Sequence, residues 1–395
     1  MSDLDTFRGE VRDWLEANCP PAMRTRAPGL KENVWGGRRK SFPNDDARIW
    51  LERCVERGFT VPEWPKEYGG AGLSKKEARV LRKEMNSLGC RTPLFNYGIS
   101  MLAPVLLEYG TDEQKLEHLP PIARGEIRWC QGYSEPGAGS DLASLQCRAV
   151  RDGEDYVING QKIWTSDADV SDWIFCLVRT DPAAAKHDGI SFILIDMESE
   201  GITVSPIPLI SGASPFCQTF FDEVRAPARN RIGKENAGWT IAKKLLEHER
   251  AMLSDGSAGG GKRESLIDVA RASLDAPSGR LPDASLRDEL AQLQMDGICY
   301  RATIERSTDA ARAGQGMGSE TSMFKLYLSE MGQRSSDWRH RVMGARGLGW
   351  DGDAYSDDEL KFTRDWLYGK ASTILGGTSE IQLNIIAKRV LGLPD

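Results

Sequence analysis

The segment Tyr133–Asp141 (YSEPGAGSD) gathers residue types that suit the binding of a small organic ligand. Its glycines allow the backbone to approach a ligand closely, and the hydroxyl groups of Ser134 and Ser140 can both donate and accept hydrogen bonds. An ordinary turn between two domains would have the same composition. The segment is therefore a candidate binding loop, and its composition alone leaves the structural alternative open.

A second segment, Gly160–Ser166 (GQKIWTS), places an aromatic ring and two hydroxyl groups in a row. A flavin ring needs a flat packing partner and hydrogen-bond donors near its reactive nitrogen, and Trp164 and Ser166 have the chemistry to supply them. A tryptophan at the end of a strand is also common in protein cores. A structural role for this segment therefore stays open at this point.

Helical patterns precede and follow these two segments. Residues 1–127 are predicted to be mostly helical, because apolar residues recur at helical spacing in the first segment and again in later ones. The later helices are expected over 47–57, 75–88 and 112–123. Residues 239–395 return to the same pattern, with long amphipathic segments over 239–255, 284–313 and 319–342.

Residues 128–238 differ from both flanking regions. The pairs Asp152-Gly153 and Asn159-Gly160 are typical of tight hairpin turns, and strand-like residues flank them. Apolar runs at 173–178 and 192–195 are typical of buried strands. We therefore expect a compact antiparallel β domain, which would carry both candidate segments.

Composition and charge exclude several classes of function. The 395 residues include 58 acidic and 51 basic side chains, a formal net charge of -7, which argues against general nucleic-acid binding. We expect no membrane insertion and no signal peptide, because neither sequence pattern is present. The eight cysteines form no C-x-x-C pair and the four histidines lack metal-ligand spacing, so we expect no metal site and a cytoplasmic location.

Four segments taken together resemble the acyl-CoA dehydrogenase family. The two segments described above are similar to the paired flavin motifs of that family. A third match is Phe221–Pro227, followed by Gly233 and Gly238-Trp239, and a fourth is Leu375–Gln382 (LGGTSEIQ). The order and spacing of the four segments match the family over nearly the whole chain.

The resemblance implies an α+β fold with three domains. These are an N-terminal helical domain (1–127), a middle antiparallel β-barrel-like domain (128–238) and a C-terminal four-helix bundle (239–395). It also implies FAD bound at a subunit interface, an acyl-CoA substrate and an electron-transfer flavoprotein as the electron acceptor. The implied assembly is a homotetramer, or a heterotetramer with a related chain.

The resemblance also assigns roles to individual positions. Tyr133 and Ser134 are expected to contact the flavin ring, Trp164 to pack against it, and Ser166 to lie near its N5 atom. Ser140 is expected to lie along the bound acyl-CoA. The other positions expected to contact FAD are Gly139, Arg346, Gly347, Thr378 and Glu380.

Two departures from the family pattern concern the diphosphate and adenine end of FAD. The family's Arg-x-x-Phe-Gly sequence has no counterpart in 264–282. Its Gln-x-x-Gly-Gly-x-Gly sequence becomes Met343–Gly349 (MGARGLG), with Met in place of Gln and Arg346 in place of the first Gly. We therefore expect the adenine end to be held differently, or by a different partner chain.

The implied reaction needs a base that removes the proton alpha to the thioester carbonyl. A carboxylate in an apolar pocket suits this task, because desolvation raises its pKa towards the working pH. Many family members carry this glutamate immediately before the Gly-Thr of the fourth segment, where this chain has Gly376. Others, including the isovaleryl-CoA type, place it on an earlier helix just before an arginine. This chain has Glu247-His-Glu249-Arg250 at that place.

Helical geometry favours Glu249 over Glu247 as the base. At about 100° per residue the two glutamates lie roughly 200° apart on the helix. Glu249 shares its face with apolar residues such as Leu245, whereas Glu247 shares a face with Lys243 and Arg250. We expect Glu247 and Arg250 to be solvated or near the polar part of CoA. The alternative is that both glutamates are ordinary surface residues.

The sequence thus predicts a FAD-dependent acyl-CoA dehydrogenase that introduces an α,β double bond into an acyl-CoA, as in the β-oxidation of fatty acids. In its general pattern the sequence is similar to those of bacterial family members that act on pimeloyl-CoA or on steroid side-chain acyl-CoAs. Two alternatives remain. One is a flavin-binding subunit of a heteromeric acyl-CoA dehydrogenase, and the other is an acyl-CoA oxidase that uses O2.

Overall fold

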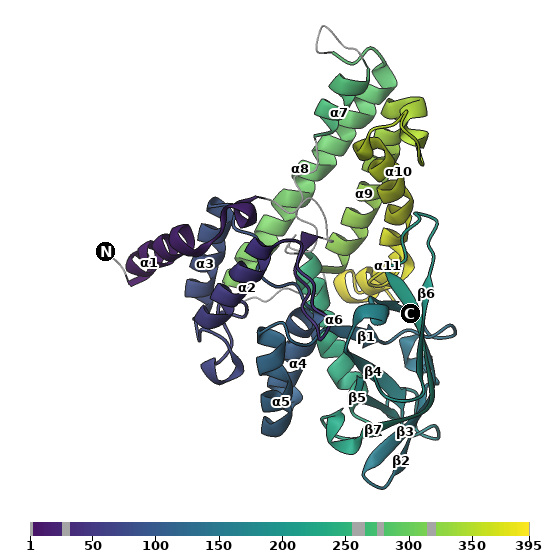
Figure 1. Cartoon of the computed structure of the whole chain (residues 1–395). Helices are drawn as coiled ribbons and strands as arrows, with labels where there is room; N and C mark the ends of the chain where they lie inside the picture. Colours follow the sequence, from purple (N-terminus) through teal and green to yellow (C-terminus); the bar gives the residue numbers. More distant parts are fainter. Residues whose placement is uncertain (1–2, 26–31, 255–264, 275–279, 314–320, 395) are drawn as a thin grey trace. The chain divides into compact units, whose positions relative to one another are not determined.

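The computed structural model describes residues 3–25, 32–254, 265–274, 280–313 and 321–394. Two compact units make up the chain (Figure 1). The first unit comprises Met1–Ile207 with Pro215–Glu249, and the second comprises Pro208–Ser214 with Arg250–Asp395. Along the sequence, a helical region is followed by a central sheet and then by a second helical region.

The N-terminal helices begin where side chains can cap them. The side-chain oxygen of Asn44 accepts a hydrogen bond from the backbone of Ala47, and Ser74 and Thr111 each form a capping box. These caps confirm the helices predicted in this region. The elements are α1 (Asp3–Asn18), α2 (Asp45–Arg57), α3 (Lys75–Ser87), the π-helix η4 (Gly98–Leu102), α4 (Ala103–Tyr109) and α5 (Asp112–Ala123).

The central region is an eight-stranded sheet with the order β6-β7-β3-β2-β4-β5-β8, and β1 pairs with β4. Most ladders are antiparallel, but β1 and β2 each run parallel to β4. The sheet is therefore mixed, which corrects the expectation of a purely antiparallel domain. The strands are β1 (Trp129–Gly132), β2 (Arg148–Asp152), β3 (Asp155–Ser166), β4 (Trp173–Arg179), β5 (Ile190–Asp196), β6 (Ile202–Ile207), β7 (Phe216–Pro227) and β8 (Arg231–Ile232).

The parallel pairing of β2 with β4 follows from the path of the chain. The chain reverses between β2 and β3, and reverses again between β3 and β4, so β4 runs in the direction of β2. Sequence patterns predict the strands and the first turn, but they do not indicate which strand pairs with β4. The parallel direction of β2 relative to β4 could therefore not be predicted from the sequence.

The two predicted hairpin turns have different outcomes. Asp152-Gly153 does connect β2 to β3, as expected. Asn159-Gly160 lies inside β3 at a β-bulge, so the prediction of a turn there is wrong. The side chain of Asn159 instead donates to Glu223 of β7 (2.6 Å) and accepts from its backbone N–H (2.9 Å), while Gly160 adopts a φ of 143°. A glycine in a strand commonly marks such a bulge.

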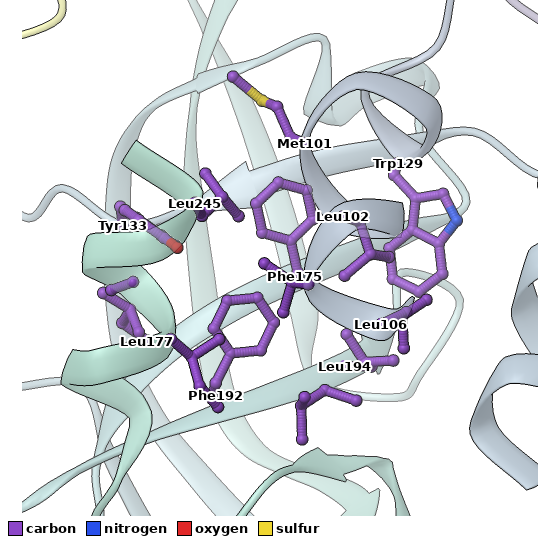
Figure 2. Packing of buried hydrophobic residues seen from close by; sticks show 14 of the residues in the cluster. Met101, Leu102, Leu106, Trp129, Tyr133, Phe175, Leu177, Phe192, Leu194 and Leu245 are labelled. Carbon is purple, nitrogen blue, oxygen red and sulfur yellow. The ribbon is translucent and has the colours of Figure 1, made fainter. Parts of the chain in front are cut away.

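Helices cover one face of the sheet through a shared apolar core (Figure 2). The rings of Phe175 and Phe192 stack with centroids 5.9 Å apart, and Tyr133 stands edge-on to both. Leu245 belongs to the same core and comes from α6 (Gly238–Ser254). The first turns of α6 thus pack with the sheet in the first unit, although the sequence places this helix at the start of the C-terminal region.

The second unit is helical, as predicted. In it α9 packs with all four of the other helices, and buried Trp338 of α9 donates its indole N–H to the carbonyl oxygen of Leu286 (3.0 Å). Its helices are α7 (Leu266–Ser273), α8 (Ala284–Arg312), α9 (Thr321–Met343), α10 (Asp357–Gly369) and α11 (Ser379–Ile385). Among the helices that the structure describes, none has the length and apolarity needed to cross a membrane.

The bulge at Gly160 generates a stability prediction. A Cβ atom at this position would come 2.8 Å from the Cα atom of Cys147, and the φ of 143° disfavours every other residue. We expect Gly160→Ala to lower the free energy of unfolding by about 2–4 kcal/mol. Gly153→Ala is the matched control, because it carries only the strain of a left-handed φ (59°) with open space around the new Cβ atom, and it should cost about 1 kcal/mol. The free energies of unfolding are measured by urea denaturation. Equal losses in the Gly160→Ala and Gly153→Ala variants would contradict the bulge at Gly160.

Candidate functional site

The two candidate segments lie side by side in the first unit. The backbone N–H of Ile163 donates to the carbonyl oxygen of Ser134 (2.9 Å). One residue away on each segment, the ammonium group of Lys162 donates to the carbonyl oxygen of Tyr133 (3.1 Å). Residue types alone singled out these segments separately, and the resemblance assigned both to one flavin ring. The structure shows that the two segments are in direct contact.

A buried ion pair connects the same two segments. The Nζ atom of Lys162 lies 2.7 Å from Oε1 of Glu135, and the two side chains are 0% and 8% exposed. Glu135 also accepts hydrogen bonds from the backbone N–H groups of Gln146 (2.6 Å) and Cys147 (2.9 Å). Sequence reasoning assigned no role to this pair. The alternation of buried residues along β3 breaks at the bulge before Lys162, so strand periodicity gave no signal that this lysine is buried.

Trp164 occupies an unusual backbone conformation. Its φ is 60°, in the left-handed region, at a register shift between Lys162 and Thr165. A bulky residue there is rare, and such strain costs on the order of 1–3 kcal/mol. The indole is half exposed and stands edge-on to the ring of Phe216 (centroids 6.1 Å apart). The strained backbone thus leaves the indole of Trp164 half exposed. An exposed aromatic face is what a flat ring ligand needs for packing.

A second strained residue closes this segment. Asp167 has a φ of 55°, and its backbone N–H donates to the carbonyl oxygen of Pro215 (2.9 Å). Burial raises the pKa of its carboxyl group, although Arg128, which is 2.9 Å away, acts in the opposite direction. Half-buried Ser166 therefore lies between two residues whose backbones are fixed in left-handed conformations.

The glycine-rich part of the first segment is open to solvent. A reciprocal pair of backbone hydrogen bonds between Glu135 and Ala138 (both 3.0 Å) forms a tight turn. Gly139 and Ser140 follow this turn and are exposed, and a Cβ atom on Gly139 would meet no atom within 4 Å. Packing within the described residues does not demand a glycine at position 139, which leaves close approach of a ligand as a reason for it.

Helix α6 presents one buried and one exposed face. Ala242 and Leu245 are fully buried, whereas Thr240 and Lys243 are exposed. The side chains of residues 247–250, which include the candidates Glu247, Glu249 and Arg250, lie outside the described residues. Helical periodicity places position 249 on the buried stripe of Ala242 and Leu245, and position 247 on the stripe of Thr240 and Lys243.

In the second unit, Arg346 has a partner within this chain. Its guanidinium forms a two-point ion pair with Glu359 (Nη2–Oε2 2.7 Å), and this pair is the main reason that the pKa of Glu359 falls to about 2. Gly347 is buried, and its carbonyl oxygen accepts a hydrogen bond from Thr363 (2.8 Å). Both residues thus have structural roles, and their contact with FAD stays a prediction.

The glycine-rich segment before α11 is also fixed by contacts inside the second unit. Thr378 is the N-cap of α11, because its hydroxyl accepts from the backbone N–H of Ile381. The ammonium group of Lys325 donates to the carbonyl oxygen of Gly377 (2.6 Å). Glu380 lies in the first turn of α11, where backbone and Thr378 hydrogen bonds lower its pKa. The contacts of Thr378 and Glu380 with FAD stay predictions.

Comparison with known families decides the identity of this arrangement. Models of the N-terminal, middle and C-terminal domains of acyl-CoA dehydrogenases match residues 2–126, 130–224 and 236–391. The chain belongs to the acyl-CoA dehydrogenase family. The predicted fold class and enzyme class are therefore confirmed, and this acyl-CoA dehydrogenase is an oxidoreductase of a flavoprotein family of lipid metabolism.

Relatives match this acyl-CoA dehydrogenase over its full length. Acyl-CoA dehydrogenase IpdE1 of Mycobacterium tuberculosis is 34% identical and is aligned over 100% of this chain and 99% of its own. FadE26 of the same organism is 35% identical over 99% and 97% of the two chains. Among solved structures, the Tcur3481-Tcur3483 steroid ACAD has a TM-score of 0.76 at 32% identity, over 100% and 98% of the chains. The ChsE4-ChsE5 complex from Mycobacterium tuberculosis has a TM-score of 0.73 at 30% identity, with the same coverage.

Proposed function

We propose that this chain is the FAD-binding, catalytic chain of an acyl-CoA dehydrogenase that desaturates a steroid-derived acyl-CoA. The observation that carries the flavin site is the junction of the two candidate segments beside the strained, half-exposed Trp164. The substrate class is supported by the similarity, over the whole chain, to a structure described as a steroid ACAD. Pimeloyl-CoA is the competing substrate, because the sequence also resembles bacterial family members that act on it.

The residues of the first unit fit a flavin ring. Trp164 offers an exposed indole face, and Thr165 buries a hydroxyl oxygen that has no hydrogen-bond partner among the described residues. Trp164 and Ser166 would hold one side of the ring, and Tyr133 and Ser134 would contact it from the first segment. FAD would supply the two-electron acceptor for the hydrogen that leaves the β carbon as hydride.

Glu249 is proposed as the base that takes the alpha proton onto its carboxylate. The support is the burial of Ala242 and Leu245, which lie on the stripe of α6 that position 249 extends. A carboxylate on an apolar stripe loses hydration, and this raises its affinity for a proton. Gly376, at the family's other location for the base, has a φ of 65°, so a glutamate there would need a left-handed backbone.

A related chain is proposed as the partner that completes the FAD site. Met343 and Arg346 replace residues of the family pattern, and Arg346 is already paired with Glu359. Two of the similar structures are described with paired names, Tcur3481-Tcur3483 and ChsE4-ChsE5. Electrons are proposed to pass to an electron-transfer flavoprotein, with O2 as the alternative acceptor.

The substrate proposal predicts which compounds reduce the bound flavin. Steroid-derived acyl-CoAs should bleach the flavin absorbance band of the purified protein faster than pimeloyl-CoA or short straight-chain acyl-CoAs. Hydrogen peroxide formed without an electron-transfer flavoprotein would favour the oxidase alternative. If a flavin-loaded preparation is bleached by none of these compounds, the proposal of a catalytic chain is wrong.

The assembly proposal predicts incomplete loading of the isolated chain. Expressed alone, the protein should contain less than one FAD per subunit, because the segment 343–349 does not complete the site. Co-expression with a related chain should restore the flavin, measured as the ratio of flavin absorbance to protein. A homotetramer with full FAD occupancy would contradict the need for a partner.

The two glutamates of α6 give a paired test of the base. Glu249→Gln keeps the size and polarity of the side chain but cannot accept the alpha proton. Flavin reduction in stopped flow should fall about a hundred- to ten-thousand-fold, while FAD content and acyl-CoA binding persist. Glu247→Gln is the matched control and should retain substantial turnover. Wild-type reduction by Glu249→Gln together with loss in Glu247→Gln would assign the base to the other face.

A further inference from the structure

Lys162 and Glu135 form the most deeply buried ion pair among those of the described residues. Burying two charges is costly, so such a pair is weak evidence of a contribution to stability. Its location is more informative than its energy. Lys162 lies two residues before Trp164, and its ammonium group bridges the carboxylate of Glu135 and the carbonyl oxygen of Tyr133.

Trp164 is constrained from both sides of its strained backbone. Before it, Lys162 and Ile163 are bonded to the first segment, and after it Asp167 is bonded to Pro215. Strained backbone persists only where the surrounding structure over-determines it. Of these constraints, the Lys162 ammonium group is the one that uses a side chain to fix β3 against the segment 133–135.

The ion pair also fixes the register of β3. The ladder between β3 and β7 shifts between Lys162 and Thr165, so the chain has a local choice of register at this place. A slip of one residue would turn alternate side chains to the opposite face of the sheet. Such a slip would separate Lys162 from Glu135 and leave both charges unpaired. The pair therefore opposes the regular register in which Trp164 would lose its left-handed conformation.

We propose that Lys162 and Glu135 are positioning residues that hold Trp164 in its exposed, strained conformation and thereby set the affinity for FAD. The effect on FAD rests on the proposed function, whereas the effect on Trp164 concerns the protein alone. Two readouts separate these parts. One reports on Trp164 in flavin-free protein, and the other reports on FAD binding.

The test variant combines Lys162→Met with Glu135→Gln. Removing both charges avoids a buried unpaired charge, and the glutamine retains an acceptor for the backbone of Gln146 or Cys147. The matched control is Arg225→Met with Asp152→Asn. It removes an ion pair of the same sheet (2.6 Å) whose side chains are 58% and 59% exposed.

The first readout is 19F NMR of flavin-free protein labelled with 5-fluorotryptophan. The Trp164 resonance is assigned from its loss in Trp164→Phe. It should shift and broaden in the Lys162/Glu135 variant, and it should be unchanged in the Arg225/Asp152 control. An unchanged Trp164 resonance in the folded Lys162/Glu135 variant would overturn the proposal, whether or not the protein binds FAD.

The second readout is the dissociation constant of FAD in titrations of flavin-free protein. The Lys162/Glu135 variant should bind FAD about tenfold or more weakly, and the control should stay within about twofold of the wild type. In a Trp164→Gly background the same double substitution should cause no further weakening, because the residue that is positioned has been removed. Equal weakening with and without Trp164 would show that the pair acts on FAD by another route.

Failure of the Lys162/Glu135 variant to fold would move the test to Lys162→Met alone. In this variant the Glu135 carboxylate keeps the backbone N–H donors of Gln146 and Cys147, so the remaining charge stays hydrogen-bonded. The Trp164 resonance should again shift, and FAD binding should weaken in the same direction. Retention of the wild-type resonance and affinity would overturn the proposal.

Discussion

A fully buried ammonium group must be paired, and this requirement at Lys162 organises the residues around the site. Its charge reaches Glu135 and the carbonyl oxygen of Tyr133, so the segment after β1 has to fold across β3. Glu135 is fixed in turn by the backbone N–H groups of Gln146 and Cys147, just before β2. This buried ion pair thus links β3 to the segment after β1 and to the residues just before β2. The ring of Tyr133 extends from the same segment into the core, where it packs edge-on against Phe175 and Phe192.

Much of this arrangement was accessible from the sequence, because local chemistry determines it. The helices predicted over 47–57, 75–88 and 112–123 rested on apolar residues at helical spacing, and they are correct. Side-chain caps at Asn44, Ser74 and Thr111 explain where these helices begin. The two candidate segments were recognised from their residue types and spacing. Their proximity followed from the resemblance, and the hydrogen bond between Ile163 and Ser134 gives it a physical basis.

The remaining features depend on partners that are distant in the sequence. Asn159-Gly160 has the composition of a turn, but Asn159 finds its partner in Glu223, and the pair of residues becomes a bulge. The parallel neighbours of β4 depend on the path of the whole chain. Arg346 was expected at FAD, yet Glu359 lies within reach of its guanidinium. None of these choices is encoded in a short window, because two outcomes are sterically possible and tertiary contacts decide between them.

The early turns of α6 have a consequence for how this chain tolerates change. Leu245 is seated in the sheet core, and position 249 follows one helical turn later, about 6 Å along the axis. The proposed base is therefore tied to the sheet by a short, stiff connection that involves none of the helices α7 to α11. Substitutions that remodel those helices, or that adapt them to a different partner chain, can accumulate while the distance from the sheet core to position 249 stays the same. The position proposed for the base and the helices proposed to adapt to a partner chain therefore belong to separate parts of the fold, and each can change without the other.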